Sequence, residues 1–440
     1  MSAGPNSRWL RVGLPVLVWA FCSLIVMLAL FRPNETPLDE DEIYWVGSSY
    51  YFDLALRQGA LRHPDWQLLP ARENPPVAKY AIGLGLALSG RRVDSPDMLG
   101  CFYLQYERIP GAWGAGAERA KREAVVTRMN PALRERLQQG AKLTIDRGTI
   151  TPARWTMLVC ALGASGWVLL MGNIIGGWRV GLLASQLLLL HPAIRGTYNL
   201  AMADAVALAF SCLAAWVALR FAGRAADARP WTAKTTWAFI GGAGAALALA
   251  AGAKMNSLVV VAWFAGVATA ASILTARNCG RNRGVAVAGT GLGALAVGGL
   301  VFVAINPAIW PNLFDGLVAA VSEHRIIEGI QAVFLTGHLV KGADKLGAVA
   351  ALGMLGYGGL ALAGLAAVWA GVVGKTAERC LAAWWLLAVV AVAAWIPFAR
   401  TRYVVPVIVP TVILVAWLLV RQLPALVRRF LKTAEMPSSG

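Results

Sequence analysis

The sequence predicts an all-α polytopic membrane protein with about ten transmembrane helices and a large external loop after the first of them. Hydrophobic residues make up 58% of the 440 residues and charged ones 14%, against roughly 45–50% and about 25% in soluble proteins. The apolar residues also gather in uncharged runs long enough for a helix to cross a roughly 30 Å hydrocarbon core. A soluble enzyme, a disordered chain and a disulfide-linked secreted module are therefore poor fits.

Ten runs are expected to span the membrane as helices, because a helix satisfies its own backbone hydrogen bonds in lipid. Eight are uninterrupted: 13–31, 155–178, 235–253, 255–276, 284–305, 346–374, 380–399 and 403–420. Two more, 180–194 and 205–219, flank a segment that holds Arg195 and Asp204. Each of these two crosses only if its ends reach the interface.

Basic residues predict the orientation, since cytoplasmic loops keep Lys and Arg. After residue 154, one alternate set of loops holds fourteen basic residues and the other holds seven, which places the first set and the C-terminus in the cytoplasm. Arg8 and Arg11 place the N-terminus there too. Residues 1–31 are interpreted as a cytoplasmic N-terminus and a retained first helix, because no small-residue cleavage site follows Phe31. We expect an inner-membrane protein whose active site faces the periplasm.

The other segments follow from this topology. Residues 32–154 form a large external loop with interfacial helices, 155–305 hold helices 2–7, 306–345 form a second external loop, 346–421 hold helices 8–10, and 422–440 form a cytoplasmic tail. Residues 74–90 are a candidate eleventh span. Only 11 uncharged residues separate Lys79 from Arg91, so a helix that lies on the membrane is favoured. Residues 94–150 match no known pattern, although 114–140 are expected to form charged surface helices.

The net charge of +17 would suggest nucleic acid if the basic residues formed one patch on a soluble domain. They lie between apolar runs, so membrane lipids are the expected partner and nucleic acid is not. The six cysteines are spread singly without a C-x-x-C pair, which predicts neither a disulfide framework nor a zinc site. No cofactor is expected. A divalent ion at the D-x-D pattern of Asp39–Asp41 is the weaker alternative, because it lacks further ligands.

Ionisable residues at the external ends of spans are the first functional candidates, because charge is costly in hydrocarbon. They are the acidic run Asp39–Glu42 and the residues Glu73, Lys79, Arg154, Asp204, Lys254 and Arg402. Carboxylates and cations thus share one face of the membrane. A carboxylate suits the role of base toward an acceptor hydroxyl. Arg or Lys suits the negative charge that develops on a departing phosphate.

Several short motifs, taken in order, resemble the C-type (GT-C) glycosyltransferases related to protein O-mannosyltransferases and lipid A aminoarabinose transferases. Residues 38–51 (LDEDEIYWVGSSYY), with a D-E-x-Y core at Asp41–Tyr44, resemble the first external loop of that family. Residues 73–80 (ENPPVAKY) are similar to its H-P-P-L-x-K segment, with Asn74 in place of His. The later motifs are Arg154-Trp155, Met202-Ala203-Asp204, Lys254 and the run RYVVP at 402–406. The resemblance covers most of residues 13–420.

The resemblance implies a GT-C-like fold and inverting transfer of a sugar from a polyprenyl-phosphate donor to an acceptor at the outer face. It assigns Asp41 as the base and Glu42 as its neighbour. Lys79, Arg154, Lys254 and Arg402 would contact the lipid phosphate, with Glu73, Asp204 and Tyr403 in the same substrate site. The acidic run leaves the register open between Asp39-Glu40 and Asp41-Glu42, and Tyr44 at the family spacing favours the second. The sugar and the acceptor, whether protein, glycan or lipid, are left open.

Structural interpretations stay open beside these roles. The acidic run can be a solvated loop, and Lys254 and Arg402 can snorkel to the interface. Asp204 can be an N-cap, and Glu73 and Lys79 can border an interfacial helix.

Three other functions are also compatible with the pattern: a polymerase or ligase that acts on lipid-linked oligosaccharides, a transporter, and a non-catalytic scaffold. Transporters often show two related halves and charges near the bilayer midplane. Neither is evident here.

Overall fold

The protein is described from a computed structural model that covers residues 5–106, 117–141, 144–227, 231–318, 343–395 and 401–434. Within these ranges every regular element is a helix. The long helices are α1 (Pro5–Leu30), α9 (Arg147–Gly176), α10 (Trp178–Leu190), α12 (Ala203–Ala226), α13 (Ala233–Ala253), α14 (Leu258–Cys279), α15 (Arg281–Ile305), α18 (Tyr357–Val373), α19 (Thr376–Trp395) and α20 (Thr401–Trp417). The second external loop expected at 306–345, with His324 and His338, lies largely outside the described residues.

The chain is a multi-pass membrane protein. Eight helices in the described ranges are long and apolar enough to cross a membrane, and a bent pair makes a ninth. That pair replaces the predicted run 346–374: α17 (Ala343–Gly353) meets α18 at 87°. The bend falls at Leu355 and Gly356, both in the left-handed region at φ 56° and 109°, which a continuing helix cannot adopt.

The predicted run 180–194 is also divided. It forms the 13-residue α10 and, after His191, the short α11 (Pro192–Asn199). A residue before proline is driven out of the helical region, and proline suits the first position of a new helix. The His191 backbone is extended accordingly, and its Nδ1 accepts from the backbone N–H of Ala193 at 3.2 Å.

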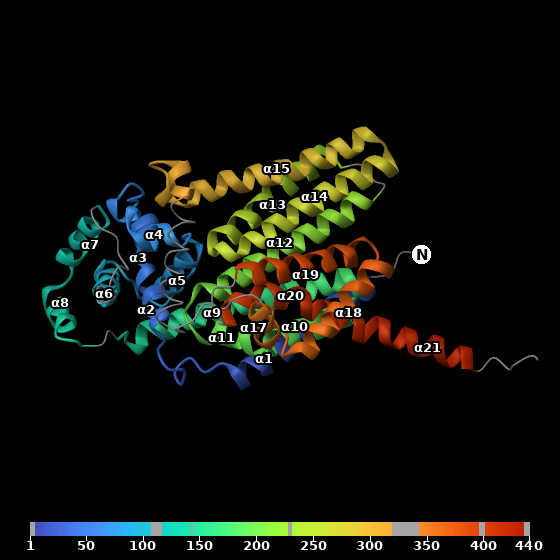
Figure 1. Ribbon diagram of the computed structural model, residues 1–440, viewed down its shortest axis with the longest axis horizontal. Coiled ribbons are helices and arrows are strands. Elements are labelled where there is room, and N and C mark those ends of the chain that lie inside the picture. The colour runs from blue at the N-terminus through green and yellow to red at the C-terminus, as the bar shows by residue number, and fades with distance from the viewer. Residues whose placement is uncertain are drawn as a thin grey trace, which may run out of the picture.

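The spans pack as two groups joined by α12. In Figure 1, α13, α14 and α15 run together on one side, and α10, α19 and α20 lie on the other. α12 packs against α9, α13 and α14 and so holds the groups together. α9 and α10 approach closely at Gly172 and Gly181: a Cβ added to Gly172 would lie 2.5 Å from the Gly181 Cα. Small residues permit such contact between membrane helices.

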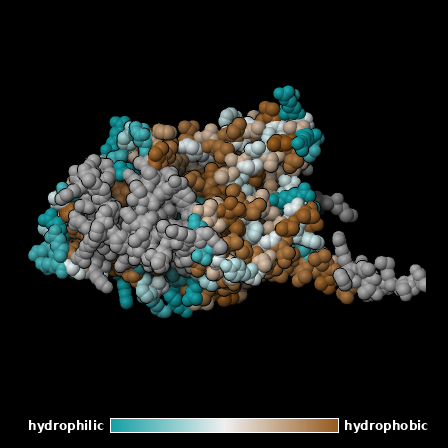
Figure 2. Space-filling model, viewed as in Figure 1, coloured by the Kyte–Doolittle hydropathy of each residue, from teal (hydrophilic) through white to brown (hydrophobic). Residues whose placement is uncertain are grey.

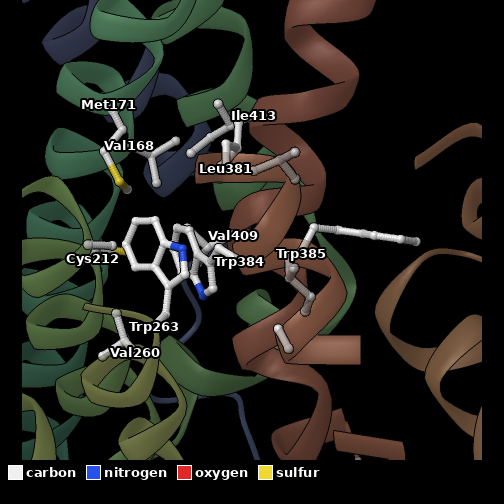
Figure 3. Close-up of a cluster of buried hydrophobic side chains, with 14 of the residues drawn as sticks. Val168, Met171, Cys212, Val260, Trp263, Leu381, Trp384, Trp385, Val409 and Ile413 are labelled. Atoms are coloured by element: carbon white, nitrogen blue, oxygen red, sulfur yellow. The ribbon is translucent and has the colours of Figure 1, made fainter. Parts of the chain in front are cut away.

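Aromatic side chains fill the centre of the bundle. Trp263 of α14 stacks on Trp384 of α19, with ring centroids 5.0 Å apart and planes 24° apart. Figure 3 shows both rings among Cys212 of α12 and Val409 of α20. The Trp263 indole N–H donates to the carbonyl of Cys380 at 3.0 Å, so its buried polar atom has a partner, as buried Trp requires.

The loop after α1 folds into short helices at one end of the bundle (Figure 1). They are α2 (Glu40–Ser48), α3 (Tyr50–Phe52), η1 (Asp53–Arg57), η2 (Pro64–Gln67), α4 (Leu69–Glu73), α5 (Val77–Leu88), α6 (Asp97–Tyr106), α7 (Ala117–Arg128) and α8 (Pro131–Gln138). The amide of Gln67 donates to the Ala308 carbonyl at 3.0 Å, and the Tyr80 hydroxyl to the Ile305 carbonyl at 3.2 Å. These bonds fix the loop to the end of α15.

Two segments of this loop can be compared with their predicted structure. Residues 74–90 contain the 12-residue α5, which is shorter than a crossing helix and packs on α3 and α9. The charged stretch 114–140 contains the helices α7 and α8, as expected. α7 is tied to the earlier part of the loop, because Arg128 pairs with the buried Asp65 at 2.5 Å.

The helix bundle has a polar region at each of its two ends. α21 (Leu423–Ala434) leaves the bundle at the end opposite to α2–α8 (Figure 1). Figure 2 shows hydrophobic side chains over the bundle between them, with hydrophilic ones gathered toward the ends. The loop helices and α21 therefore lie at opposite ends of the bundle.

Candidate active site

The acidic run forms the first turn of α2, and the helix start decides its register. Asp39 is the N-cap: its carboxylate accepts from the backbone N–H of Asp41 at 2.9 Å. The Glu42 carboxylate accepts in return from the backbone N–H of Asp39 at 3.1 Å, which completes a capping box. Asp41 is half-buried. The side chain of Glu40 lies outside what the structure describes.

Glu42 is held in a buried ion pair with Arg154 of α9. The Nε and Nη2 atoms of Arg154 donate to the two carboxylate oxygens at 2.8 and 2.6 Å. The backbone N–H of Ala201, just before α12, adds a third bond at 2.6 Å. Glu42 is fully buried and Arg154 is 2% exposed. This carboxylate therefore joins α2 to α9 and α12 and has no access to an acceptor.

The remaining donors of Arg154 also bond inside the protein. Its Nη1 donates to the carbonyls of Pro33 and Thr36, and its Nη2 donates to the carbonyl of Pro37 as well as to Glu42. With the Nε bond, all five donors of the guanidinium are used. The pair holds the loop behind α1 in place, and the expectation that Arg154 contacts the phosphate and that Glu42 assists the base stays a prediction.

Glu73 and Lys79 belong to a second buried group below α2. The Tyr44 hydroxyl donates to Glu73 at 3.1 Å and accepts from the Asn74 amide at 3.3 Å. Burial, reinforced by Glu73, raises the pKa of Tyr44 well above its usual value. The Lys79 ammonium donates to the carbonyls of Pro70 and Asn74. Lys79 is fully buried, and these two bonds fasten the turn before α5.

Burial lowers the pKa of Lys79 to about 7 from 10.5, and Glu73 opposes this in part. Between these two values the unfolded chain binds a proton at Lys79 that the folded chain has released. Stability is therefore expected to rise with pH across this window and to carry the full penalty of a buried charge below it.

Replacing Lys79 with methionine is expected to remove this rise, because the variant has no proton to release. The measurement is the melting temperature of wild type and variant in detergent at several pH values between about 7 and 10. The exposed Lys234, replaced in the same way, is the control. If the difference in melting temperature between wild type and the Lys79 variant is the same at every pH, the lowered pKa of Lys79 is contradicted.

Three distant spans meet where Lys254 contacts Asp204 and Tyr403. The Lys254 ammonium lies 2.7 Å from an Asp204 carboxylate oxygen and 6.0 Å from the centre of the Tyr403 ring. Asp204 is in the first turn of α12 but is not its N-cap, which is Met202. Lys254 is the C-cap of α13. Lys254 is only 8% exposed, and its Asp204 partner makes it more than a snorkelling side chain.

The elements that carry these groups meet in one buried cluster. Its members include Tyr44–Val46 of α2, Val77 and Ala78 of α5, Ala153 of α9, Ala201–Ala203 before and at the start of α12, and Ala253 at the end of α13. Contact is close at Gly252, where an added Cβ would lie 2.6 Å from Val77. The structure therefore brings the acids behind α1 and the basic residues of distant helices to the same end of the bundle.

An apolar cavity of about 330 Å³ adjoins this cluster between α13, α14 and α15. Pro75 and Ala251 line it, two residues away from Val77 and Ala253 of the cluster. Its polar lining residues are Arg72 of α4 and Asn306 at the end of α15. Sequence reasoning missed both: Arg72 stands outside every motif, and the polar break after the apolar run of α15 was the only signal for Asn306.

No protein-family model and no curated protein matches the chain. Solved structures do resemble it in fold. The archaeal oligosaccharyltransferase AglB from Archaeoglobus fulgidus, in complex with an inhibitory peptide and a dolichol-phosphate, has a TM-score of 0.51 at 12% identity over 97% of this chain and 52% of that chain. The apo form of the Archaeoglobus enzyme has a TM-score of 0.50 at 11% identity, with the same coverage.

ArnT from Cupriavidus metallidurans, bound to undecaprenyl phosphate, has a TM-score of 0.49 at 15% identity over 95% of this chain and 62% of that chain. The chain thus spans 52–62% of the length of these structures. The chain has a GT-C-like fold. This confirms the fold that the motifs implied, and a likeness at this identity shows the fold alone.

Within the GT-C-like fold, the predicted site residues divide into three groups. Glu42 pairs with Arg154, Glu73 accepts a hydrogen bond from Tyr44 close to Lys79, and Asp204 pairs with Lys254. Asp41 is a half-buried acid in the first turn of α2. Arg402 is the second residue of α20, next to Tyr403, but its side chain lies outside what the structure describes. Among the described residues, no group of three or more His, Cys, Asp or Glu side chains is placed to hold a metal ion.

Proposed function

We propose that the protein is a membrane glycosyltransferase that moves a sugar from a polyprenyl-phosphate donor to an acceptor at the outer face of the inner membrane. The observation that supports this most is the position of Asp41. It is a half-buried acid in the first turn of α2. The neighbouring Glu42–Arg154 pair holds that turn rigidly against the spans, which is the support a catalytic group needs.

In the proposed reaction, the Asp41 carboxylate accepts the proton of an acceptor hydroxyl as its oxygen attacks the sugar's anomeric carbon. The bond from that carbon to the phosphate oxygen breaks, and the phosphate leaves without being protonated. A single displacement inverts the anomeric configuration. Because phosphate is a good leaving group, the paired acid of a glycosidase is not needed. Lys254 and Arg402 would stabilise the charge that develops on the leaving group.

The donor class is supported by the likeness to AglB, whose structure holds a dolichol-phosphate. The excess of basic residues in one alternate set of the short loops after residue 154 supports cytoplasmic termini and an external site. The AglB likeness also keeps a second donor under consideration, a lipid-linked oligosaccharide, because AglB is an oligosaccharyltransferase.

The test is to reconstitute the purified chain in liposomes with defined donors and to identify the products by mass spectrometry. Release of polyprenyl phosphate from a monophosphate-linked monosaccharide, with the sugar recovered on an acceptor, is the expected result. Turnover only with a diphosphate-linked oligosaccharide would favour the polymerase or ligase. Uptake of a sugar or lipid without any product would favour a transporter and refute the transferase.

A further inference from the structure

The C-terminal helix α21 has one apolar face and one basic face. Its apolar residues recur at the spacing of three and four that places them on one side of a helix: Leu423, Leu426, Val427, Phe430 and Leu431. The basic residues fall on the opposite side, and they are Arg428, Arg429 and Lys432. The apolar residues other than Phe430, whose side chain lies outside what the structure describes, are exposed. The bundle therefore leaves this apolar face uncovered.

α21 begins where the chain leaves its last span. α20 continues through the π-helix η5 (Leu418–Gln422) into α21 without a break in the helix. Residues 403–422, helical throughout, already supply the roughly 20 residues that a crossing needs. At the end of this stretch, the Trp369 indole of α18 donates to the side-chain oxygen of Gln422 at 3.2 Å. Trp gathers at the membrane interface, so this bond places the start of α21 at the level of the headgroups.

The joint between η5 and α21 is a point where the helix can bend. Proline has no N–H to donate, and its ring clashes with the carbonyl four residues earlier. Pro424 is the second residue of α21, so the affected carbonyl belongs to Val420 in η5. Sharp changes in helix direction occur at prolines and at π-bulges, and both features coincide here. α21, which leaves the bundle at this point (Figure 1), can therefore turn onto the membrane surface.

We propose that α21 lies on the membrane surface at this end of the bundle and binds anionic phospholipid headgroups. Its apolar face enters the boundary between headgroups and acyl chains, and its basic face meets the lipid phosphates. Arg428 is exposed, and among the described residues only its Nε has a partner, the Pro424 carbonyl at 3.2 Å. Because α21 starts at the headgroups, the bilayer is the nearest apolar phase that can cover it. The inference does not depend on the proposed function.

The test is hydrogen–deuterium exchange of the full-length chain in nanodiscs that hold one copy each. Discs of phosphatidylcholine alone are compared with discs that also contain phosphatidylglycerol. The amides of residues 425–434 are expected to exchange at least about tenfold more slowly with phosphatidylglycerol, because each basic residue near an anionic surface contributes about fivefold. Salt at about 1 M should remove most of this difference, since it screens charges beyond about 3 Å.

Three variants separate the two faces of α21. Arg428→Gln is expected to reduce the effect of phosphatidylglycerol by about fivefold. Leu431→Gln should speed exchange by about tenfold in both lipids, because it removes apolar surface from the membrane. Leucine and glutamine have similar helix propensities, so this change reports burial. Ala425→Gln places the same side chain on the basic side and should change little. Melting temperatures confirm that the bundle is intact in each variant.

Equal exchange of residues 425–434 in the two lipids, or equal effects of Leu431→Gln and Ala425→Gln, would overturn the proposal. Slow exchange that appears only in discs with two copies of the chain would assign the apolar face to a second copy instead. Fast exchange in every lipid would show that the membrane does not cover this face, and would leave it to a soluble partner. Sugar transfer is not measured in this assay, so its outcomes are separate from those that test the proposed function.

Discussion

Replacing Arg154 with methionine is expected to destabilise the folded protein by about 3–5 kcal/mol, because Glu42 is then left as an unpaired charge in a buried site. The variant also frees the carbonyls of Pro33, Thr36 and Pro37 that hold the chain behind α1. The measurement is thermal unfolding of the purified protein in detergent. The exposed Arg195, replaced by methionine, is the control and should change little.

A second substitution separates a positioning role from a phosphate contact. Glu42→Gln in the Arg154→Met background removes the unpaired charge, so the double variant is expected to melt above the single one. If Arg154 acts only on the lipid phosphate, the single variant will melt like wild type and lose only activity. That result, or a double variant no more stable than the single, would contradict the assignment.

Replacing Asp41 with asparagine is expected to lower sugar transfer by about 10²–10⁴-fold, the usual contribution of a general base. The fold should survive, because asparagine has nearly the same size as aspartate and keeps the backbone N–H that bonds to the Asp39 cap. Turnover is measured with the monophosphate-linked donor, and melting temperature reports the fold.

Asp39→Asn is the matched control for this experiment. It makes the same chemical change two residues away, and asparagine caps a helix about as well as aspartate. It should therefore keep both stability and turnover. Unchanged turnover in the Asp41 variant, or an equal loss in the Asp39 variant, would remove Asp41 as the base.

The spans were predictable from the sequence because lipid imposes a simple rule. An uncharged run of about 20 residues must be helical to satisfy its backbone, so α12–α15 follow from composition. The breaks within the predicted helices were harder to predict. The proline after His191 was visible in the sequence, whereas the 87° bend at Leu355 depends on a left-handed backbone that neither hydropathy nor charge reveals.

The sequence indicated which residues belong to the candidate site, but not which acid pairs with which cation. Charge at span ends identified Glu42, Arg154, Asp204 and Lys254, because ionisable groups persist beside hydrocarbon only with a role. Which cation meets which acid depends on how α2 docks on α9 and α12. The family resemblance implied that Arg154, like Lys254, contacts the phosphate, and it gave no sign that all five donors of Arg154 bond inside the protein.

Arg72 could not be identified from the sequence at all. Nothing beside it in the sequence distinguishes it from other loop arginines. It becomes a candidate only because α4 sets it against α13 and α15 at the cavity.

The most direct measurement is a cryo-electron microscopy structure of the chain with undecaprenyl phosphate bound in a lipid nanodisc. We expect the phosphate of the lipid on the same side of the membrane as Asp41 and Lys254, close to the Lys254 ammonium. Phosphate density at the end that bears α21, or on the leaflet opposite to Asp41, would contradict the account.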